Sequence, residues 1–267
     1  MTKKKRLDIM VHDANITESR EMARRVIMAG QIYVDGQKAD KPGVMYKTDC
    51  KLECRGKKLP YVSRGGLKLE KAIKDFKISL QNKITMDIGA STGGFTDCML
   101  QNGARKVYAI DVGYGQLAWK LRSDPRVVNF ERTNFRYMRR ESILDDIDFF
   151  SVDVSFISLK LILPVTKNFL KENGTAVCLI KPQFEAGKNL VGKKGVVRDP
   201  KVHIDVINNT CTFANKSEYT VLGLDYSPIK GPEGNIEYLM YLQNTTPKST
   251  YSYDIEKLVA KANSTLN

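Results

Sequence analysis

Three charged residues stand where the sequence predicts that apolar strands begin or end. Asp153 follows FFSV, Lys181 follows TAVCLI, and Glu237 opens the run IEYLMYLQ. The chain has only two histidines, so proton transfer in an active site would have to depend on lysine or carboxylate groups. Each of the three residues also has an ordinary structural interpretation: a helix cap, a lysine that leaves the core, and a solvated glutamate.

A glycine-rich turn supplies the second chemical signal. The stretch KITMDIGASTGGF predicts a buried strand, a tight turn and the start of a helix, whose first amides are free to donate hydrogen bonds. It lacks the Gly-Lys-Ser/Thr of a phosphate-binding loop and the G-x-G-x-x-G of a dinucleotide site. An acidic residue before the first glycine would repel a pyrophosphate but accept hydrogen bonds from a cationic amino-acid ligand. The pattern therefore favours S-adenosyl-L-methionine over NAD, with these candidate binding residues: Asp87, Gly89, Ser91, Gly93 and, for ribose hydroxyls at the end of the next strand, Asp111.

The elements that would position these residues alternate along the chain from residue 83 onward. Apolar strands are expected at 84–88, 107–110, 127–130, 148–152, 175–180, 219–226 and 236–243, with helical segments between most of them. This alternation predicts βαβ units and a parallel sheet whose ligands lie at the carboxyl ends of the strands. Segment 184–200 is glycine-rich and basic, which is typical of a mobile active-site loop.

Composition points to a polyanionic partner. The 267 residues carry a formal charge of +13, from 43 basic and 30 acidic residues, and such a balance favours nucleic acid or an acidic membrane surface. Neither an 18-residue apolar run nor a signal-peptide core occurs, so we expect a cytoplasmic protein without stable membrane insertion. The five cysteines are scattered and do not complete a zinc site, so no metal is expected.

The N-terminal residues predict a small basic module. SREMARRVIMAG reads as a helix with Arg20, Arg24 and Arg25 on one face, and an Asp35-Gly36 turn predicts a hairpin after it. Residues 1–60 contain 14 Lys and Arg against 8 Asp and Glu, a net charge of +6. Basic charge on a helix face beside a hairpin is typical of RNA binding; a merely solvated basic face is the alternative.

Two family resemblances extend this interpretation. SREMARRVIMAGQIYVDGQKADKP is similar to the S4 RNA-binding domain. The motifs VSRGGLKLEKAI, DIGASTGGFTD, DVGYGQL, SVDVSFISL, LIKPQFEAG and GNIEY resemble, in order, those of the TlyA (hemolysin A-like) family of rRNA 2′-O-ribose methyltransferases. The resemblance implies a Lys-Asp-Lys-Glu catalytic tetrad at Lys68, Asp153, Lys181 and Glu237. Without it, Lys68 would pass for a surface lysine at the start of a helix.

The resemblance also implies a fold and a domain order. The fold class is α/β, a Rossmann-like S-adenosylmethionine-dependent methyltransferase domain with a seven-stranded, mostly parallel sheet, after a small α+β S4 domain. We expect the S4 domain at 1–58, a linker at 59–64, an FtsJ-like domain at 65–245 and a polar tail at 246–267 that could form a short helix. Predicted RNA contacts are Arg6, Arg20, Arg24, Arg25, Lys38, Lys41, Arg64 and Lys188.

The implied reaction is methylation of a cytidine 2′-hydroxyl in rRNA, with assembled ribosomal subunits as the expected partner. Lys181 could remove the hydroxyl proton if burial and Lys68 favour its neutral amine, but nearby carboxylates oppose this, so the proton's route stays open. The subunit, the nucleotide and the oligomeric state also stay open. Three other functions remain as alternatives: a membrane-lytic hemolysin, a non-catalytic ribosome-assembly factor, and a methyltransferase for a small molecule or protein.

Overall fold

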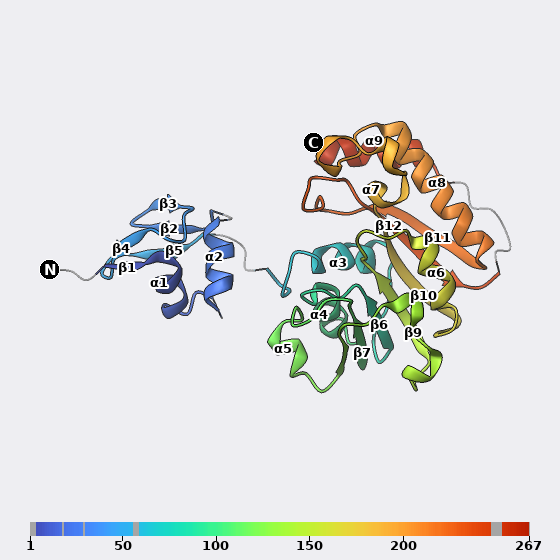
Figure 1. Cartoon of the computed structure of the whole chain (residues 1–267), viewed down its shortest axis with the longest axis horizontal. Helices are drawn as coiled ribbons and strands as arrows, with labels where there is room; N and C mark the ends of the chain where they lie inside the picture. Colours follow the sequence, from blue (N-terminus) through green and yellow to red (C-terminus); the bar gives the residue numbers. More distant parts are fainter. Residues whose placement is uncertain (1–3, 18, 29, 56–58, 247–252, 267) are drawn as a thin grey trace. The chain divides into compact units, whose positions relative to one another are not determined.

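The computed structural model describes residues 4–17, 19–28, 30–55, 59–246 and 253–266. The chain divides into two compact units, residues 1–58 and 59–267 (Figure 1). Residues 56–58, at the end of the predicted S4 domain, and 247–252, in the predicted tail, lie outside the described residues.

The N-terminal unit packs two helices against two small sheets. Helices α1 (Leu7–Asp13) and α2 (Arg20–Met28) bury Leu7, Val11, Ala23 and Ile27 in its core. The strands are β1 (Lys4–Arg6), β2 (Ile32–Val34), β3 (Gln37–Ala39), β4 (Met45–Lys47) and β5 (Leu52–Cys54), arranged as β1-β4 and β3-β2-β5.

Two details of this unit agree with the sequence pattern, and two were not expected from it. Ser19 Oγ accepts a hydrogen bond from Met22 N at 3.1 Å, as a helix cap does. Asp35 and Gly36 have φ of 48° and 81°, which suits the two-residue hairpin turn between β2 and β3. Residue periodicity gave no sign of helix α1 or of the β1-β4 pair, because both are too short to establish a pattern.

A seven-stranded mixed sheet forms the centre of the second unit, with strand order β11-β12-β10-β9-β6-β7-β8. β12 runs opposite to the other six strands of this sheet, which share one direction. The predicted fold class is confirmed. The strands are β6 (Ile84–Ile88), β7 (Lys106–Ile110), β8 (Val127–Phe130), β9 (Ile147–Val152), β10 (Leu170–Ile180), β11 (Tyr219–Tyr226) and β12 (Tyr238–Asn244).

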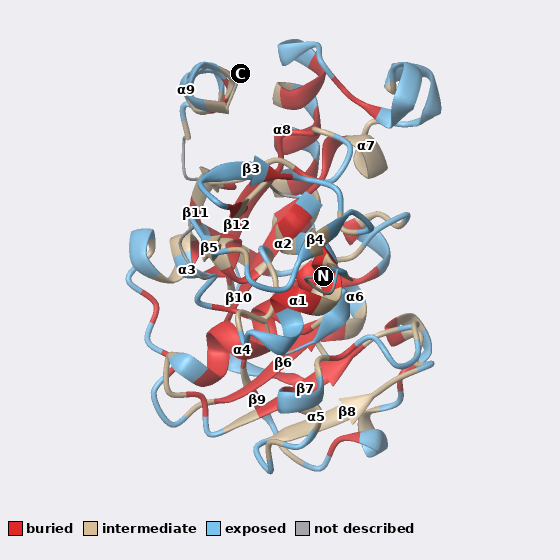
Figure 2. Cartoon of the chain, turned by 90° about the vertical axis from the view of Figure 1, so that its left-hand side faces the viewer, coloured by how far each residue is buried: buried red, intermediate tan, exposed pale blue. Residues whose placement is uncertain are grey.

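Helices cover both faces of this sheet. On one face, α3 (Gly66–Asp75) and α4 (Gly94–Gln101) contribute Leu69, Ala72 and Met99 to a buried cluster with side chains of β7 and β10. The opposite face is covered by α6 (Leu163–Thr166), α8 (Pro200–Lys216) and α9 (Ile255–Leu266). Two four-residue helices, α5 (Trp119–Arg122) and α7 (Pro182–Glu185), follow β7 and β10. Buried residues, red in Figure 2, run along β6 and α4. The carboxyl ends of β6, β9 and β10 are thus held by packing on both sides.

Candidate active site

Strand topology explains why four residues from distant parts of the sequence meet. Asp153 follows the end of β9, and its amide donates to Ile88 O at the end of neighbouring β6. Lys181 directly follows β10. Because β12 is antiparallel to β10, with Tyr238 opposite Ile180, Glu237 lies beside the end of β10 and not at the far edge of the sheet. Lys68 reaches the same place from the first turn of α3.

The four side chains form one chain of charge contacts. Lys68 Nζ lies 2.6 Å from Glu237 Oε2 and 3.3 Å from Asp153 Oδ2. Lys181 Nζ lies 2.5 Å from Asp153 Oδ1 and donates to Ser155 Oγ at 3.2 Å. The side chains of Lys68, Lys181 and Glu237 are at most 9% exposed and that of Asp153 is 17% exposed, so the contacts are shielded from water.

Electrostatics distinguish the two lysines. Burial disfavours the Lys68 ammonium, but the carboxylates of Asp153 and Glu237 outweigh it, so the pKa of Lys68 lies above its ordinary value. Burial likewise disfavours the Asp153 carboxylate, but the ammonium groups of Lys68 and Lys181 outweigh it and hold the pKa of Asp153 below its ordinary value. Lys68 is therefore a fixed cation between two carboxylates, whereas Lys181 is paired with the carboxylate of Asp153.

A pocket of about 230 Å³ joins the tetrad to the glycine-rich turn. Its walls come from the segment before α3, the turn after β6, and the ends of β9, β10 and the loop before β12. They are Ser63, Gly65, Lys68, Gly89, Ala90, Ser91, Thr92, Gly94, Phe95, Asp153, Ser155, Lys181, Pro232 and Glu237.

The turn needs its glycines to keep this shape. Gly89 has φ of 88°, and a Cβ there would lie 2.6 Å from the carbonyl oxygen of Asp153. Gly93 has φ of 93°, and a Cβ would lie 2.3 Å from Leu121 Cδ1. Both positions combine a left-handed backbone with a close approach that only glycine allows. The turn is thus held against the strand end that carries Asp153.

Asp87 lies beneath the turn and is fully buried. Its oxygens accept hydrogen bonds from Thr96 Oγ1 at 2.7 Å and Ser151 Oγ at 3.2 Å. Burial raises the pKa of Asp87 to about 7 against these hydrogen bonds. Asp87 is not among the pocket's lining residues, so its visible role is to tie β6 to the first turn of α4 and to β9.

Asp111 also supports the turn. It follows β7, and its carboxylate accepts from Ser91 N at 2.8 Å and Gly113 N at 2.7 Å. Ser91 Oγ donates to Gln116 at 3.2 Å. The predicted ribose-binding carboxylate thus lies beside the predicted donor loop, and it remains partly exposed.

An exposed aromatic residue, Phe156, follows Asp153 closely in the sequence. The residue is 91% exposed, and its φ is 64°, a backbone conformation that is rare for an aromatic residue. The ring lies 5.1 Å from that of Phe184, in α7 directly beyond the tetrad lysine. In the motif DVSFISL the sequence places Phe156 three residues after Asp153, but it does not show the unusual φ or the exposure of the ring.

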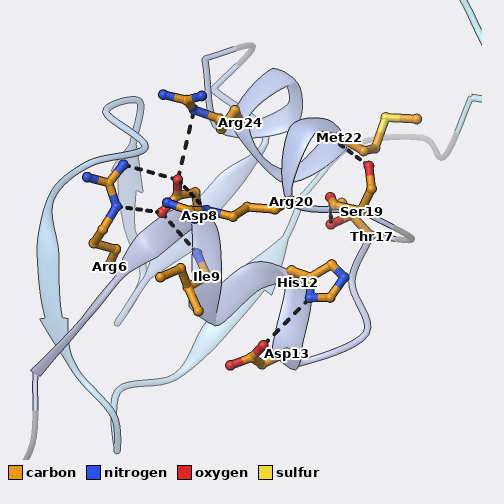
Figure 3. A network of polar contacts seen from close by, with 10 residues as sticks. All are labelled: Arg6, Asp8, Ile9, His12, Asp13, Thr17, Ser19, Arg20, Met22 and Arg24. Carbon is orange, nitrogen blue, oxygen red and sulfur yellow. Dashed lines mark hydrogen bonds and ion pairs between the residues drawn. The ribbon is translucent and has the colours of Figure 1, made fainter. Parts of the chain in front are cut away.

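The predicted RNA contacts fall into two groups. Arg6, Arg20 and Arg24 converge on Asp8 in the N-terminal unit (Figure 3), whereas Arg25 pairs with Glu21 one turn away. The remaining four are exposed on their own units: Lys38, Lys41, Arg64 and Lys188.

Comparisons with known proteins agree with this geometry. Residues 61–244 match the FtsJ-like methyltransferase family and residues 5–49 match the S4 domain. The Bacillus subtilis (strain 168) protein described as "Putative rRNA methyltransferase YqxC" is 54% identical over 242 residues, covering 90% of this chain and 86% of the relative. The 16S/23S rRNA (cytidine-2′-O)-methyltransferase TlyA of Mycobacterium tuberculosis (strain H37Rv) is 38% identical over 263 residues, 98% of each chain. A solved structure described as a "Putative hemolysin from Streptococcus thermophilus" has a TM-score of 0.80 and 46% identity, covering 99% of this chain and 98% of that one.

Fold and site together define a Rossmann-like, S-adenosylmethionine-dependent methyltransferase preceded by an S4 domain. The relatives narrow the class further, since they match across both units. The chain belongs to the TlyA family of rRNA 2′-O-methyltransferases. Within the described ranges, no helix is both long enough and apolar enough to cross a membrane.

Proposed function

We propose that the chain transfers the methyl group of S-adenosyl-L-methionine to the 2′-hydroxyl of a cytidine in ribosomal RNA, with Lys68, Asp153, Lys181 and Glu237 as its catalytic tetrad. The observation that carries this proposal is the continuous set of tetrad contacts in the same pocket as the glycine-rich turn. Family membership supports the reaction class, and the name of the mycobacterial relative supports cytidine as the nucleotide.

Gly89 and Ser91, two of the residues predicted to bind the methyl donor, line the pocket. Gly89 leaves no room for a Cβ against the carbonyl oxygen of Asp153. The backbone of this turn therefore lies close to a ligand bound in the pocket. We assign Gly89, Ser91 and Gly93 to the donor loop, Asp111 to the ribose hydroxyls, and Asp87 to the support of that loop beneath the methionine end. The bound donor supplies an activated methyl group, so the chain's own residues have to orient the hydroxyl in line and accept its proton.

Lys181 is the better candidate for the proton acceptor. Lys68 is held as an ammonium by two carboxylates, which disqualifies it as a base. Lys181 contacts Asp153 and the Ser155 hydroxyl in the wall of the pocket. In its neutral form the Lys181 amine would take the 2′-hydroxyl proton, while Asp153 orients it and Glu237 orients Lys68. The Lys68 ammonium would attract the adjacent phosphate or the ribose oxygen.

Phe156 is proposed to receive the target base. A ribose inside a folded helix is accessible only if its nucleotide leaves the stack, which costs a few kcal/mol. Stacking on an exposed aromatic ring returns about 1–3 kcal/mol per base. The ring of Phe156 stands three residues beyond Asp153 and so is close to where the ribose has to lie.

The S4 unit, with the predicted basic residues, is proposed to grip structured rRNA in an assembled subunit, in the cytoplasm. Its basic helix face would bind phosphates without reading bases, so it would supply affinity while the pocket selects the nucleotide.

Transfer of radiolabelled methyl to separated ribosomal subunits and to free rRNA tests the proposal. Label on rRNA in wild type that is absent in Lys181→Ala supports it and names the subunit. If the protein binds the donor but labels no rRNA, the substrate class is wrong. Vesicle lysis by the pure protein without donor would favour the hemolysin alternative, and rRNA binding without donor binding would favour an assembly factor.

A further inference from the structure

A buried carboxylate lies at the centre of the basic surface in the N-terminal unit. Asp8, in the first turn of α1, has no exposed side-chain area, yet three partly exposed arginines reach it from β1 and α2 (Figure 3). Arg6, Arg20 and Arg24 have side chains that are 39%, 53% and 58% exposed. Because the Asp8 carboxylate is buried and the three arginines around it are exposed, Asp8 holds the arginines in place and does not itself contribute a charge to the surface.

The contacts divide both carboxylate oxygens among the arginines. Arg6 donates from Nε to Oδ1 at 3.0 Å and from Nη2 to Oδ2 at 3.1 Å. Arg20 donates from Nε to Oδ2 at 3.1 Å, and Arg24 Nε lies 3.9 Å from the same oxygen. Ile9 N completes the set by donating to Oδ1 at 3.0 Å. Contacts through Nε leave the terminal Nη groups of Arg20 and Arg24 available for a ligand, because a guanidinium has five N–H donors in a fixed fork.

Charge balance explains why the carboxylate matters. Three guanidinium groups around one carboxylate carry a net charge of +2, and without the carboxylate they would repel one another and separate. The hydrogen bonds from Arg6, with further help from Arg20, outweigh burial and hold the pKa of Asp8 at about 2, so it stays ionised at neutral pH. The guanidinium groups are therefore fixed close together before any ligand arrives.

We propose that Asp8 is a positioning residue that assembles Arg6, Arg20 and Arg24 into a single binding site for phosphates of the RNA backbone. Clustered guanidinium groups bind phosphate oxygens with charge-assisted hydrogen bonds, and fixing the side chains in advance removes part of the entropic cost of binding. This inference rests on the proposed RNA substrate and assigns its phosphate contact to one carboxylate-centred cluster. Arg25, which pairs with Glu21, lies outside that cluster.

The decisive comparison is Asp8→Asn against Asp13→Asn. Both changes raise the net charge by one on the same helix, but Asp13 pairs with exposed Lys5 and not with the arginines. If charge alone mattered, both variants would bind rRNA at least as tightly as wild type. We expect Asp8→Asn to bind rRNA roughly 10-fold or more weakly than wild type. The slope of log affinity against log salt concentration should be smaller by about 0.9 for each phosphate that the cluster no longer neutralises. Asp13→Asn should bind like wild type.

A second pair keeps the test valid if Asp8→Asn does not fold. Arg20→Lys and Arg55→Lys both preserve charge in the N-terminal unit. Arg20 contacts Asp8, whereas Arg55 pairs with Glu53. A lysine at position 20 has no fork that can serve both Asp8 and a phosphate. Arg20→Lys should weaken rRNA binding and raise KM in methyl transfer with little change in kcat, whereas Arg55→Lys should change neither. Equal binding by Asp8→Asn and wild type, or equal losses in the two lysine variants, would overturn the inference. Failure of wild type to bind rRNA would instead refute the proposed function.

Discussion

The sharpest test of the site is to replace Lys181 in two ways. Lys181→Ala removes the amine, and Lys181→Arg keeps a cation opposite Asp153 that stays protonated and cannot act as a base. If Lys181 accepts the hydroxyl proton, both variants should lose about 10²- to 10⁴-fold in the methyl-transfer rate, which is roughly 3–5 kcal/mol of barrier. If the residue supplies only positive charge, Lys181→Arg should retain most of the activity.

Stability has to be measured alongside the rate. In Lys181→Ala the Asp153 Oδ1 loses a cation 2.5 Å away in a site that is largely shielded from water. A buried acceptor left without its partner costs about 1–3 kcal/mol, and each kcal/mol lowers Tm by about 2–4 °C in a domain of this size. Lys181→Arg should melt closer to wild type, so a low rate in that variant cannot be attributed to unfolding.

Single-turnover transfer of labelled methyl to rRNA, well below the melting point of each variant, is the appropriate assay. Donor affinity from calorimetry should change by less than about threefold, because Lys181 is assigned to the acceptor side of the pocket. Lys216→Ala, an exposed lysine at the end of α8, serves as a matched control that should be fully active. A rate within about threefold of wild type for either Lys181 variant would refute the assignment of Lys181 as the base.

Three further predictions follow from the residues around the pocket. The folded chain holds the proton of Asp87 up to about pH 7, whereas the unfolded chain releases it near pH 3.9. Because the folded state binds more protons between these two pH values, the free energy of unfolding should fall by up to about 4 kcal/mol as pH rises through this window. Thermal melts of Asp87→Asn at several pH values should lack this slope. Gly89→Ala should abolish donor binding and lower Tm, because its Cβ would meet the carbonyl oxygen of Asp153 at 2.6 Å. Gly115→Ala is the matched control: its φ is 70°, no atom lies within 4 Å of its Cβ, and it should cost only about 1 kcal/mol of stability. Donor titration and thermal melts distinguish the two variants. Phe156→Ala should lower kcat/KM for rRNA about 10-fold or more at unchanged donor affinity, and Phe156→Tyr should restore it; equal rates in Phe156→Ala and wild type would remove the base-stacking role.

Strand positions were the most predictable part of the fold. β6, β8 and β11 lie at the residues that apolar runs predicted. β6 is buried and parallel to its neighbours, and such a strand reads as a short continuous apolar segment. β10 begins at Leu170, five residues earlier than predicted, because its pairing with β9 shifts register between Leu170 and Thr175 through a polar stretch. Local patterns do not record such a shift.

The predictable part of the site has a similar limit. The glycine turn and the strand-end residues could be predicted, because each is identified by the residues next to it in the sequence. The contact between Lys68 and Glu237 joins residues 169 positions apart and was expected only through family resemblance. Asp8 and Phe156 could not be singled out from the sequence for a related reason. The contacts of Asp8 come from arginines of two other elements, and Phe156 is marked by an unusual φ that sequence periodicity does not report.

The reversed direction of β12 is what makes the two lysines unequal. A parallel strand in its place would begin at the opposite edge of the sheet, and Glu237 would lie far from Lys68. The tetrad would then hold two lysines and a single carboxylate, Asp153, with a net charge of +1. With Glu237 beside the end of β10, the tetrad carries two positive and two negative charges. Lys68 contacts both carboxylates, whereas Lys181 is paired with that of Asp153. The topology therefore places Lys68 between two carboxylates and pairs Lys181 with one, and this difference is the ground for proposing Lys181 as the proton acceptor.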